Sequence, residues 1–314
     1  MIKTKNSNIY IVMYHYVREI KKSKFQNLKG LEFKDFKKQI NFFIKHFNII
    51  SHNDLVEILQ TKKIPKKKSI LLTFDDGYID HWKYVFPYLR EKKITGNFYP
   101  PVQVIKNNKV LDVNKIHFIL EKELDRKKIL KSIFKYTNKY LNKDENSLNL
   151  NKIETKNRYD DKETVIIKRL LQSHLPLKIR EKITNKLFNE IVSHSEESFS
   201  KKLYMDTKNM KEMFSNKMSF GSHGNNHYWW ENLSNHDQER ELKTSINFFK
   251  SIKVYDSNFS VCYPYGSYNL NTIKMIKKNN IKFALTTRVG SLNKKNIRYN
   301  FELPRHDTND FKNH

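Results

Sequence analysis

Two adjacent carboxylates and a pair of histidines carry the strongest chemical signal in this sequence. Asp75 and Asp76 directly follow an apolar run at residues 69–74, and His223 and His227 lie far downstream. Side chains of neighbouring residues at a strand end point in different directions, so one carboxylate can ligate a metal ion while the other takes a proton. One Asp and two His form a common open site for a divalent metal ion that activates water.

Each part of this pattern also has an ordinary explanation. Asp-Asp-Gly is a frequent turn sequence, and a His-x-x-x-His pair in a chain with 12 histidines can cap a helix or line a polar turn. The combination favours chemistry, because the carboxylates end an apolar strand and the chain supplies both kinds of ligand. We therefore predict a site for one divalent metal ion.

Three short motifs occur in the order typical of one enzyme family. They are Leu-Thr-Phe-Asp-Asp-Gly-Tyr at 72–78, Ser-His-Gly-Asn-Asn-His at 222–227 and Tyr-Pro-Tyr-Gly at 263–266. The chain resembles the NodB-like polysaccharide deacetylases of carbohydrate esterase family 4. The resemblance implies a hydrolase that acts on carbon–nitrogen bonds other than peptide bonds and removes an N-acyl group, usually acetyl, from an amino sugar.

The resemblance also implies the roles of the residues in the motifs. Asp76, His223 and His227 would hold the metal ion, for which we expect zinc. Asp75 would be the general base that takes a proton from the attacking water. The backbone N–H of Tyr265 would donate a hydrogen bond to the oxyanion of the tetrahedral intermediate.

Four further residues are candidates for substrate contacts. Pro264 would fix the path of the third motif, and Gly266 would let the substrate approach closely. Trp229 and Trp230 follow the second motif, and aromatic faces stack on sugar rings. Packing in the core is the equal alternative for both tryptophans.

The third motif departs from the family at one position. Many members have an arginine three residues before the tyrosine, where it orients the catalytic aspartate, but here that residue is Cys262. We expect Arg305 to replace this arginine. A salt bridge at the surface is the alternative for Arg305.

Two histidines are candidates for the general acid that protonates the leaving amine. His306 lies near the end of the chain, where the family has a Leu-x-His motif, but the spacing differs by one residue. His15 lies in Met-Tyr-His-Tyr-Val at 13–17, and family members that begin with this pattern look circularly permuted. We favour His15.

The order of predicted elements indicates an α/β protein with a parallel sheet. Strands are expected at 9–17, 48–51, 69–74, 96–100, 218–221, 259–263, 281–286 and 301–303, and helices at 33–47, 54–60, 80–92, 236–253 and 270–279. The resemblance implies a distorted (β/α) barrel of about seven strands. Barrels carry their chemistry at the carboxyl ends of strands, and the candidate residues fall at or just after predicted strands.

The catalytic barrel is expected to be discontinuous. It would comprise 1–104 and 211–314, while 105–210 would form a helical insertion. The predicted helices of the insertion span 115–141, 162–172 and 178–193, with a polar break near 142–160.

Composition and charge limit the cellular compartments and the binding partners that are consistent with this sequence. The 314 residues include 21 Phe and 17 Tyr, which indicates a folded protein, and the single cysteine excludes an internal disulfide and fits a reducing compartment. The net charge of +27 suits a phosphorylated partner, although the Lys-, Asn- and Ile-rich composition explains it more simply. Because no motif set for nucleic acid accompanies the charge, we expect no nucleic-acid binding.

The predicted location is cytoplasmic, with peripheral contact at the inner membrane. The apolar run at the start of the chain is short, broken by a histidine and without a small-residue cleavage site, so we interpret it as a strand. No segment approaches the ~20 apolar residues that span a bilayer. We expect an intracellular step of bacterial surface polysaccharide biosynthesis on a nucleotide-linked or lipid-linked sugar. Removal of a formyl group or an O-acetyl ester, or a catalytically inactive carbohydrate-binding protein, are the alternatives.

Overall fold

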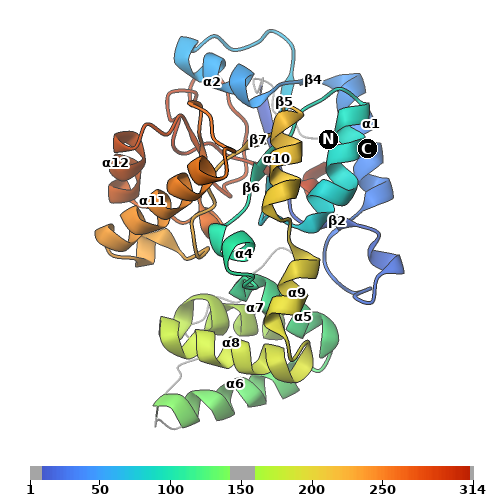
Figure 1. The fold of residues 1–314 in the computed structure, drawn as a ribbon, viewed down its shortest axis with the longest axis vertical. Coiled ribbons are helices and arrows are strands. Elements are labelled where there is room, and N and C mark those ends of the chain that lie inside the picture. Colours follow the sequence, from blue (N-terminus) through green and yellow to red (C-terminus); the bar gives the residue numbers. More distant parts are fainter. Residues whose placement is uncertain (1–8, 142–159, 312–314) are drawn as a thin grey trace. The chain divides into compact units, whose positions relative to one another are not determined.

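The computed structural model of this chain describes residues 9–141 and 160–311, so the polar break predicted near 142–160 falls almost entirely outside the described residues. The chain divides into two compact units, coloured along the sequence in Figure 1. The first unit is formed by Met1–Glu19, Gly30–Asn108 and Lys201–His314, and the second by Ile20–Lys29 and Lys109–Ser200. Compared with the predicted insertion at 105–210, the second unit is shorter at both ends and includes an additional N-terminal segment.

The first unit is built on a parallel sheet with β5 (Ser69–Asp75) at its centre. β1 (Ile9–Tyr14) pairs with one edge of β5 over its first six residues. The other edge of β5 pairs with β4 (Asn48–Ile49) at its start and with β6 (Asn97–Tyr99) at its end. β7 (Ser219–Phe220) continues the sheet beyond β6, and β10 (His306–Asp307) continues it beyond β1.

Short pairings close this sheet into a barrel. Ser222, just after β7, bridges to β8 (Val261–Cys262), and β8 pairs with β9 (Ala284–Leu285). β9 then bridges to Leu303, from which the chain runs on into β10 and back to β1. Within the described residues this circuit has seven positions, which confirms the predicted distorted (β/α) barrel. The strand predicted at 301–303 forms only the bridge at Leu303.

The alternation of side chains along β5 explains how the site is aimed. Every residue of this strand is buried, as expected for a strand covered on both faces. Phe74 packs between the rings of Tyr14 and Phe98, with centroids 4.9 and 4.8 Å away, in the core that faces the helices. Leu71 belongs to the separate core inside the barrel. Asp75 shares the inward face with Leu71 because alternate residues of a strand point to the same side.

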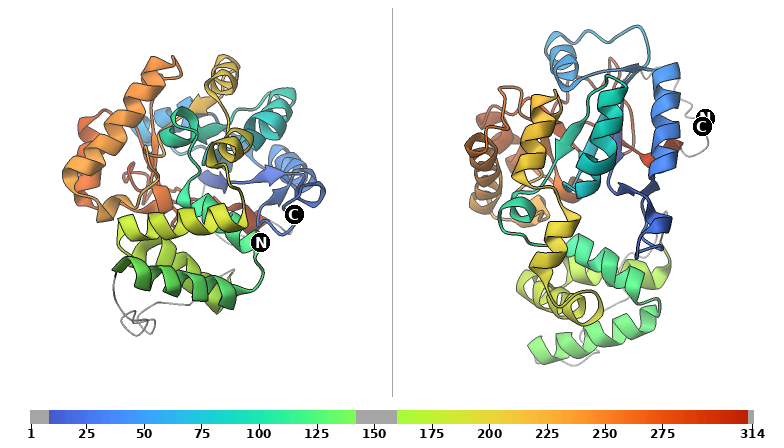
Figure 2. Two further views of the ribbon diagram at one scale, coloured as in Figure 1. Left: turned by 60° about the horizontal axis from the view of Figure 1, so that its bottom comes forward. Right: turned by 45° about the vertical axis from the view of Figure 1, so that its right-hand side comes forward.

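Helices surround the strands of the first unit, as the two views in Figure 2 show. Their amphipathic sequences bury one face against the barrel, as the 3.6-residue period predicts. They are α1 (Phe33–His46), α2 (His52–Thr61), α3 (Phe86–Glu91) after a π-helical turn at His81–Val85, α4 (Val102–Lys106), α10 (Thr207–Ser215), α11 (Asn235–Ser251) and α12 (Leu270–Lys278). Short elements complete the unit: β2 (Val17–Arg18) pairs with β3 (Leu31–Glu32), and 3-10 turns lie at Trp230–Asn232, Pro264–Gly266 and Thr308–Phe311.

The second unit is helical in its described residues. It contains a 3-10 turn at Ile20–Lys22, α5 (Asp112–Lys122), α6 (Arg126–Leu141), α7 (Lys162–Arg169) with a π-helical turn at Leu170–His174, α8 (Leu177–Ile191) and most of α9 (Glu196–Leu203). The helix predicted over 115–141 is two helices. Asp125 interrupts it, because its side chain accepts hydrogen bonds from the N–H groups of Lys127 and Lys128 and so begins a new helix.

Among the described residues, no helix combines the length and the apolar composition needed to cross a membrane.

Candidate active site

The carboxyl ends of the parallel strands bring the predicted residues to one end of the barrel. His15 follows β1, Asp75 ends β5, and His223 comes three residues after β7. Asp76 and Gly77 both have left-handed backbone conformations, with φ of 69° and 72°. A side chain at Gly77 would place its Cβ 2.5 Å from Cβ of Pro100, so this turn requires glycine.

Asp76, His223 and His227 converge on one point. Oδ1 of Asp76 lies 3.6 Å from Nε2 of His223 and 3.5 Å from Nε2 of His227, and the two Nε2 atoms are 3.1 Å apart. All three side chains are buried. Nδ1 of His223 lies 2.7 Å from the carbonyl oxygen of Cys262, so this nitrogen carries the proton and Nε2 presents its lone pair to the cluster.

The donor set of this cluster fits a divalent cation. Oδ1 of Asp76 is buried and has no hydrogen-bond partner among the described residues, whereas its Oδ2 accepts a 2.6 Å hydrogen bond from the hydroxyl of Tyr78. Burial, together with the neighbouring His223, lowers the pKa of His227 to about 3, so its imidazole is neutral and able to ligate. An orphaned carboxylate oxygen facing two neutral imidazoles is the arrangement of an Asp-His-His metal site.

Asp75 is held by a buried arginine. The Arg305 guanidinium makes two contacts with its carboxylate, 2.9 Å to Oδ1 and 2.8 Å to Oδ2, and its Nε donates to the carbonyl of Thr286. Arg305 is 1% exposed, so it is not the surface salt bridge considered as the alternative. Burial alone would raise the pKa of Asp75, but Arg305, His223 and His15 hold it well below its ordinary value. Asp75 is therefore ionised.

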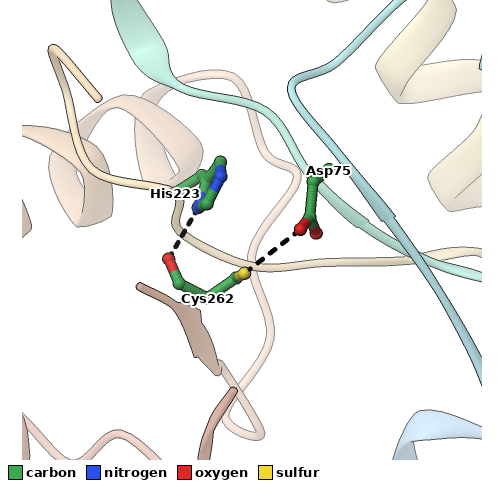
Figure 3. Close-up of side chains that lie close together, drawn as sticks. All are labelled: Asp75, His223 and Cys262. Carbon is green, nitrogen blue, oxygen red and sulfur yellow. Dashed lines mark hydrogen bonds between the residues drawn. The ribbon is translucent and has the colours of Figure 1, made fainter. Parts of the chain in front are cut away.

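Cys262 lies beside the same carboxylate, as the close-up in Figure 3 shows. Its Sγ donates to Oδ2 of Asp75 over 3.5 Å. Burial raises the pKa of the thiol well above its ordinary value, so the thiol stays protonated and acts as a donor. Cys262, the last residue of β8, and Arg305, the residue before β10, therefore both contact the carboxylate of Asp75.

The family model described as polysaccharide deacetylase matches residues 62–141 and 182–284, more than half of the chain and including all three motifs. The chain belongs to the polysaccharide deacetylase family. It is therefore a hydrolase, and its family implies an acetylated carbohydrate as substrate. A search of curated proteins found no match.

Solved structures share the deacetylase fold at low sequence identity. The Streptococcus pyogenes deacetylase PplD in complex with acetate superposes with a TM-score of 0.60 at 18% identity, over 96% of this chain and 93% of that one. IcaB from Ammonifex degensii gives 0.58 at 12%, over 95% and 91%. The BpsB deacetylase domain from Bordetella bronchiseptica gives 0.57 at 15%, over 97% of both chains.

Only one of the two general-acid candidates reaches the centre of this deacetylase. Nε2 of His15 lies 4.0 Å from Oδ2 of Asp75, and the His15 side chain is 41% exposed. His306 is buried elsewhere, with Nε2 2.8 Å from Oγ of Ser291 and its ring against Tyr10. Arg305 directly precedes β10 and His306 begins it, and adjacent side chains of an extended segment face opposite sides, so Arg305 points to Asp75 in the barrel and His306 points away from it. The structure therefore favours His15 over His306.

The two tryptophans after the second motif also differ in position: Trp229 lies near the cluster, whereas Trp230 lies in the core. The Tyr265 ring lies 4.7 Å from that of His227 and stacks on Trp229, with centroids 4.6 Å apart at an interplanar angle of 11°. Trp229 is partly exposed and remains a candidate for sugar contact. Trp230 is fully buried against Tyr263, so it belongs to the core and does not present a face to a substrate.

The turn around Pro264 and Gly266 is constrained by the fold itself. Pro264 is buried, and Tyr265 has a left-handed backbone with φ of 58°. Gly266 also has a positive φ of 71°, and a Cβ there would lie 2.3 Å from Oγ1 of Thr287. The turn and its contact with Thr287 therefore already require glycine here, and the approach of a substrate to Gly266 stays a prediction.

Tyr78, which was not among the predicted site residues, contacts the cluster directly. The hydroxyl of Tyr78 fixes Oδ2 of Asp76, and its ring stacks on Tyr16 at 4.1 Å and on Tyr204 at 5.9 Å. The signal was available, because Tyr78 ends the first motif two residues after Asp76. A tyrosine at that spacing can reach back to the free oxygen of a carboxylate ligand.

Proposed function

We propose that this deacetylase is metal-dependent and removes an N-acetyl group from an amino sugar during the biosynthesis of a surface polysaccharide. The observation that carries this proposal is the buried, unpartnered Oδ1 of Asp76 facing Nε2 of His223 and Nε2 of His227. These three atoms would hold one divalent ion, for which we expect zinc. When bound, the ion would supply Lewis acidity toward the amide carbonyl and lower the pKa of water.

The residues of the chain account for the proton transfers. Asp75, kept ionised by Arg305, accepts a proton from the attacking water as the new carbon–oxygen bond forms. The backbone N–H of Tyr265 donates to the oxyanion of the tetrahedral intermediate. His15 then gives a proton to the nitrogen as the carbon–nitrogen bond breaks. The products are acetate and the free amine of the sugar.

We expect the acyl group that is removed to be acetyl rather than formyl. Acetate, the product expected here, is bound in the Streptococcus pyogenes deacetylase structure that shares this fold. The net charge of +27 supports a phosphorylated carrier, either nucleotide-linked or lipid-linked, and hence a step on the cytoplasmic side of the inner membrane with peripheral contact.

Acetate release is the direct test of this function. We expect zinc-loaded protein to release acetate from a nucleotide-linked or a lipid-linked N-acetyl sugar, and chelator-treated protein to regain this activity when zinc is added back. N-formyl and O-acetyl sugars serve as comparison substrates. Zinc-loaded wild-type protein that released acetate from none of the N-acetyl sugars would refute the proposal.

Metal analysis tests the ligand set separately. We expect one zinc ion per wild-type chain and loss of that ion in His223→Ala and in His227→Ala, because each change removes one of three ligands. His306→Ala is the matched control, since His306 is also a buried histidine but lies away from the cluster. Full zinc occupancy in both ligand variants would exclude this site.

A further inference from the structure

A buried glutamate, Glu241, holds the backbone between His223 and His227 by hydrogen bonds. The N–H groups of Asn225 and Asn226 both donate to Oε2 of Glu241 over 2.8 Å, and the side-chain amide of Asn226 donates to Oε1. Glu241 belongs to α11 and is 3% exposed. One carboxylate therefore fixes two successive peptide groups of the loop.

The start of α4 also holds this loop by hydrogen bonds. The carbonyl of Gly224 accepts from the N–H of Val102, and that of Asn225 accepts from the N–H of Gln103. The side-chain amide of Gln103 donates to the carbonyl of Asn226 over 3.1 Å. Because the N–H of Gly224 donates to Oγ of Ser222, every backbone N–H and carbonyl of residues 224–226 has a partner.

The backbone conformation of the loop explains why it needs these hydrogen bonds. Gly224 and His227 both have left-handed backbones, with φ of 73° and 58°. A non-glycine residue such as His227 is strained in such a conformation and keeps it only where its surroundings enforce it. Without the contacts to 224–226, the chain would relax and Nε2 of His227 would leave its position 3.1 Å from Nε2 of His223.

We propose that Glu241 and Gln103 are positioning residues that hold the loop at 224–226, and through it His227, in the geometry that binds the metal ion. The inference rests on the proposed metal site and adds to it the two residues that shape it. Groups that orient metal ligands affect metal affinity by about 10–100-fold when they are removed. A residue that only stabilised the fold would lower the unfolding temperature without this effect.

The test measures zinc affinity by competition with a chromogenic chelator. Glu241→Ala and Gln103→Ala are each expected to bind zinc about 10–100-fold more weakly than the wild type. Compared with Glu241→Ala, Glu241→Gln is expected to restore most of the affinity, because its amide oxygen can accept from the two backbone N–H groups and its amide NH2 can donate to Oδ1 of Asn226 once the side-chain amide of Asn226 turns over. In metal-free protein, amide hydrogen exchange at Asn225 and Asn226 should be faster in Glu241→Ala.

Gln238→Ala is the matched control. Gln238 is also buried on α11 and also makes two hydrogen bonds, but to Leu233 and Thr272 rather than to the loop. It should lose thermal stability and keep its zinc affinity. Should Glu241→Ala not fold, the partly exposed Gln103→Ala carries the test.

The outcomes separate this inference from the proposed function. If wild-type protein binds zinc and releases acetate but both alanine variants keep wild-type zinc affinity, the positioning role is refuted alone. An equal loss of affinity in Gln238→Ala would refute it too, because the effect would then follow stability. If wild-type protein binds no zinc, the proposed metal site falls and this inference falls with it.

Discussion

Asp75 and Arg305 form a buried ion pair whose partners are 230 residues apart in the sequence. Both contacts are shorter than 3 Å, and the side chains of Arg305 and Asp75 are 1% and 2% exposed. The pair does two things for the site: it keeps Asp75 ionised, and it fixes the direction in which the carboxylate accepts a proton. A pair of this kind costs desolvation to form, but removing one partner leaves a buried charge without compensation.

We expect Arg305→Met to lower the free energy of unfolding by about 3–5 kcal/mol, since it strands the Asp75 carboxylate in the barrel. Adding Asp75→Asn should recover most of that loss, because the stranded charge is then removed. Urea unfolding of the two single variants and the double variant gives the coupling energy. Strictly additive losses would show that the two side chains do not stabilise each other. Both Arg305→Met and the double variant should lose deacetylation.

The two histidine candidates allow a direct comparison of activity. His15→Ala should lower kcat by about 10²–10⁴-fold, because His15 lies at the Asp75 carboxylate and reaches solvent. His306→Ala should change kcat much less, since His306 bonds to Ser291 away from the cluster. Steady-state acetate release measures both variants under zinc saturation. If His306→Ala lost more activity, the assignment of the general acid would have to be reversed.

At the scale of residues, the sequence predicted the cluster but not all of its supports. Asp75, Asp76 and the two histidines of the second motif were predictable because strand ends and motif spacing are local features. Glu241 was not, since its role depends on how α11 packs against a loop 15 residues earlier. The burial of Trp230 was also hidden, because adjacent tryptophans look alike in sequence.

At the scale of elements, the π-helical turn at His81–Val85 supports His15, the candidate general acid. It places Nε2 of His81 2.8 Å from the backbone carbonyl of His15, which lies just beyond β1. His81 is fully buried, and burial lowers its pKa to about 4 despite this hydrogen bond. The ring is therefore neutral in the folded protein at neutral pH.

This buried histidine predicts a loss of stability in acid. The unfolded chain takes up a proton near the ordinary histidine pKa of about 6.5, whereas the folded chain does so near 4. Below pH 6.5 the unfolded state therefore binds more protons, and stability falls as the pH drops toward 4. As the pH falls from 7 to 5, His81 alone should lower the free energy of unfolding by about 2 kcal/mol.

We expect His81→Gln, which retains a donor for the carbonyl of His15, to reduce the stability difference between pH 7 and pH 5 by about 2 kcal/mol. Urea unfolding at both pH values, in the presence of a chelator, measures the difference. His46→Gln, an exposed change on α1, is the control. An unchanged pH dependence in His81→Gln would mean that His81 is not the group responsible.

The elements themselves were predicted with uneven success. The helices at 33–47, 236–253 and 270–279 were placed within about two residues, because their apolar spacing is regular. The last strands were predicted too long, since barrel closure there uses two-residue pairings and single bridges that leave no alternating pattern. The helices at α9 and α10 were not predicted, because they are short and their sequences are mainly polar.

At the scale of the whole molecule, each unit has a hydrophobic core of its own. In the second unit four phenylalanine rings pack in a chain of contacts, with centroid distances of 4.7 Å from Phe25 to Phe118, 4.9 Å from Phe118 to Phe199 and 5.2 Å from Phe199 to Phe188. Phe25 explains why Ile20–Lys29 belongs to this unit and not to the barrel. The core of the first unit contains no residue of this chain of rings.

Separate cores predict separate responses to a core mutation. Phe188 is fully buried, so Phe188→Ala should cost about 3–5 kcal/mol, and we expect that loss to be confined to the second unit. Native-state hydrogen exchange followed by mass spectrometry should then show peptides of α5 and α8 exchanging on the order of 100-fold faster or more, while peptides of β1 and β5 stay protected. Phe36→Ala, in the core of the first unit, should give the reverse pattern.

Zinc affinity should be unchanged in Phe188→Ala, because all the ligands belong to the first unit. Equal acceleration in both units would instead show that the chain unfolds as one cooperative body, and a zinc affinity weakened tenfold or more would show that the helical unit supports the metal site.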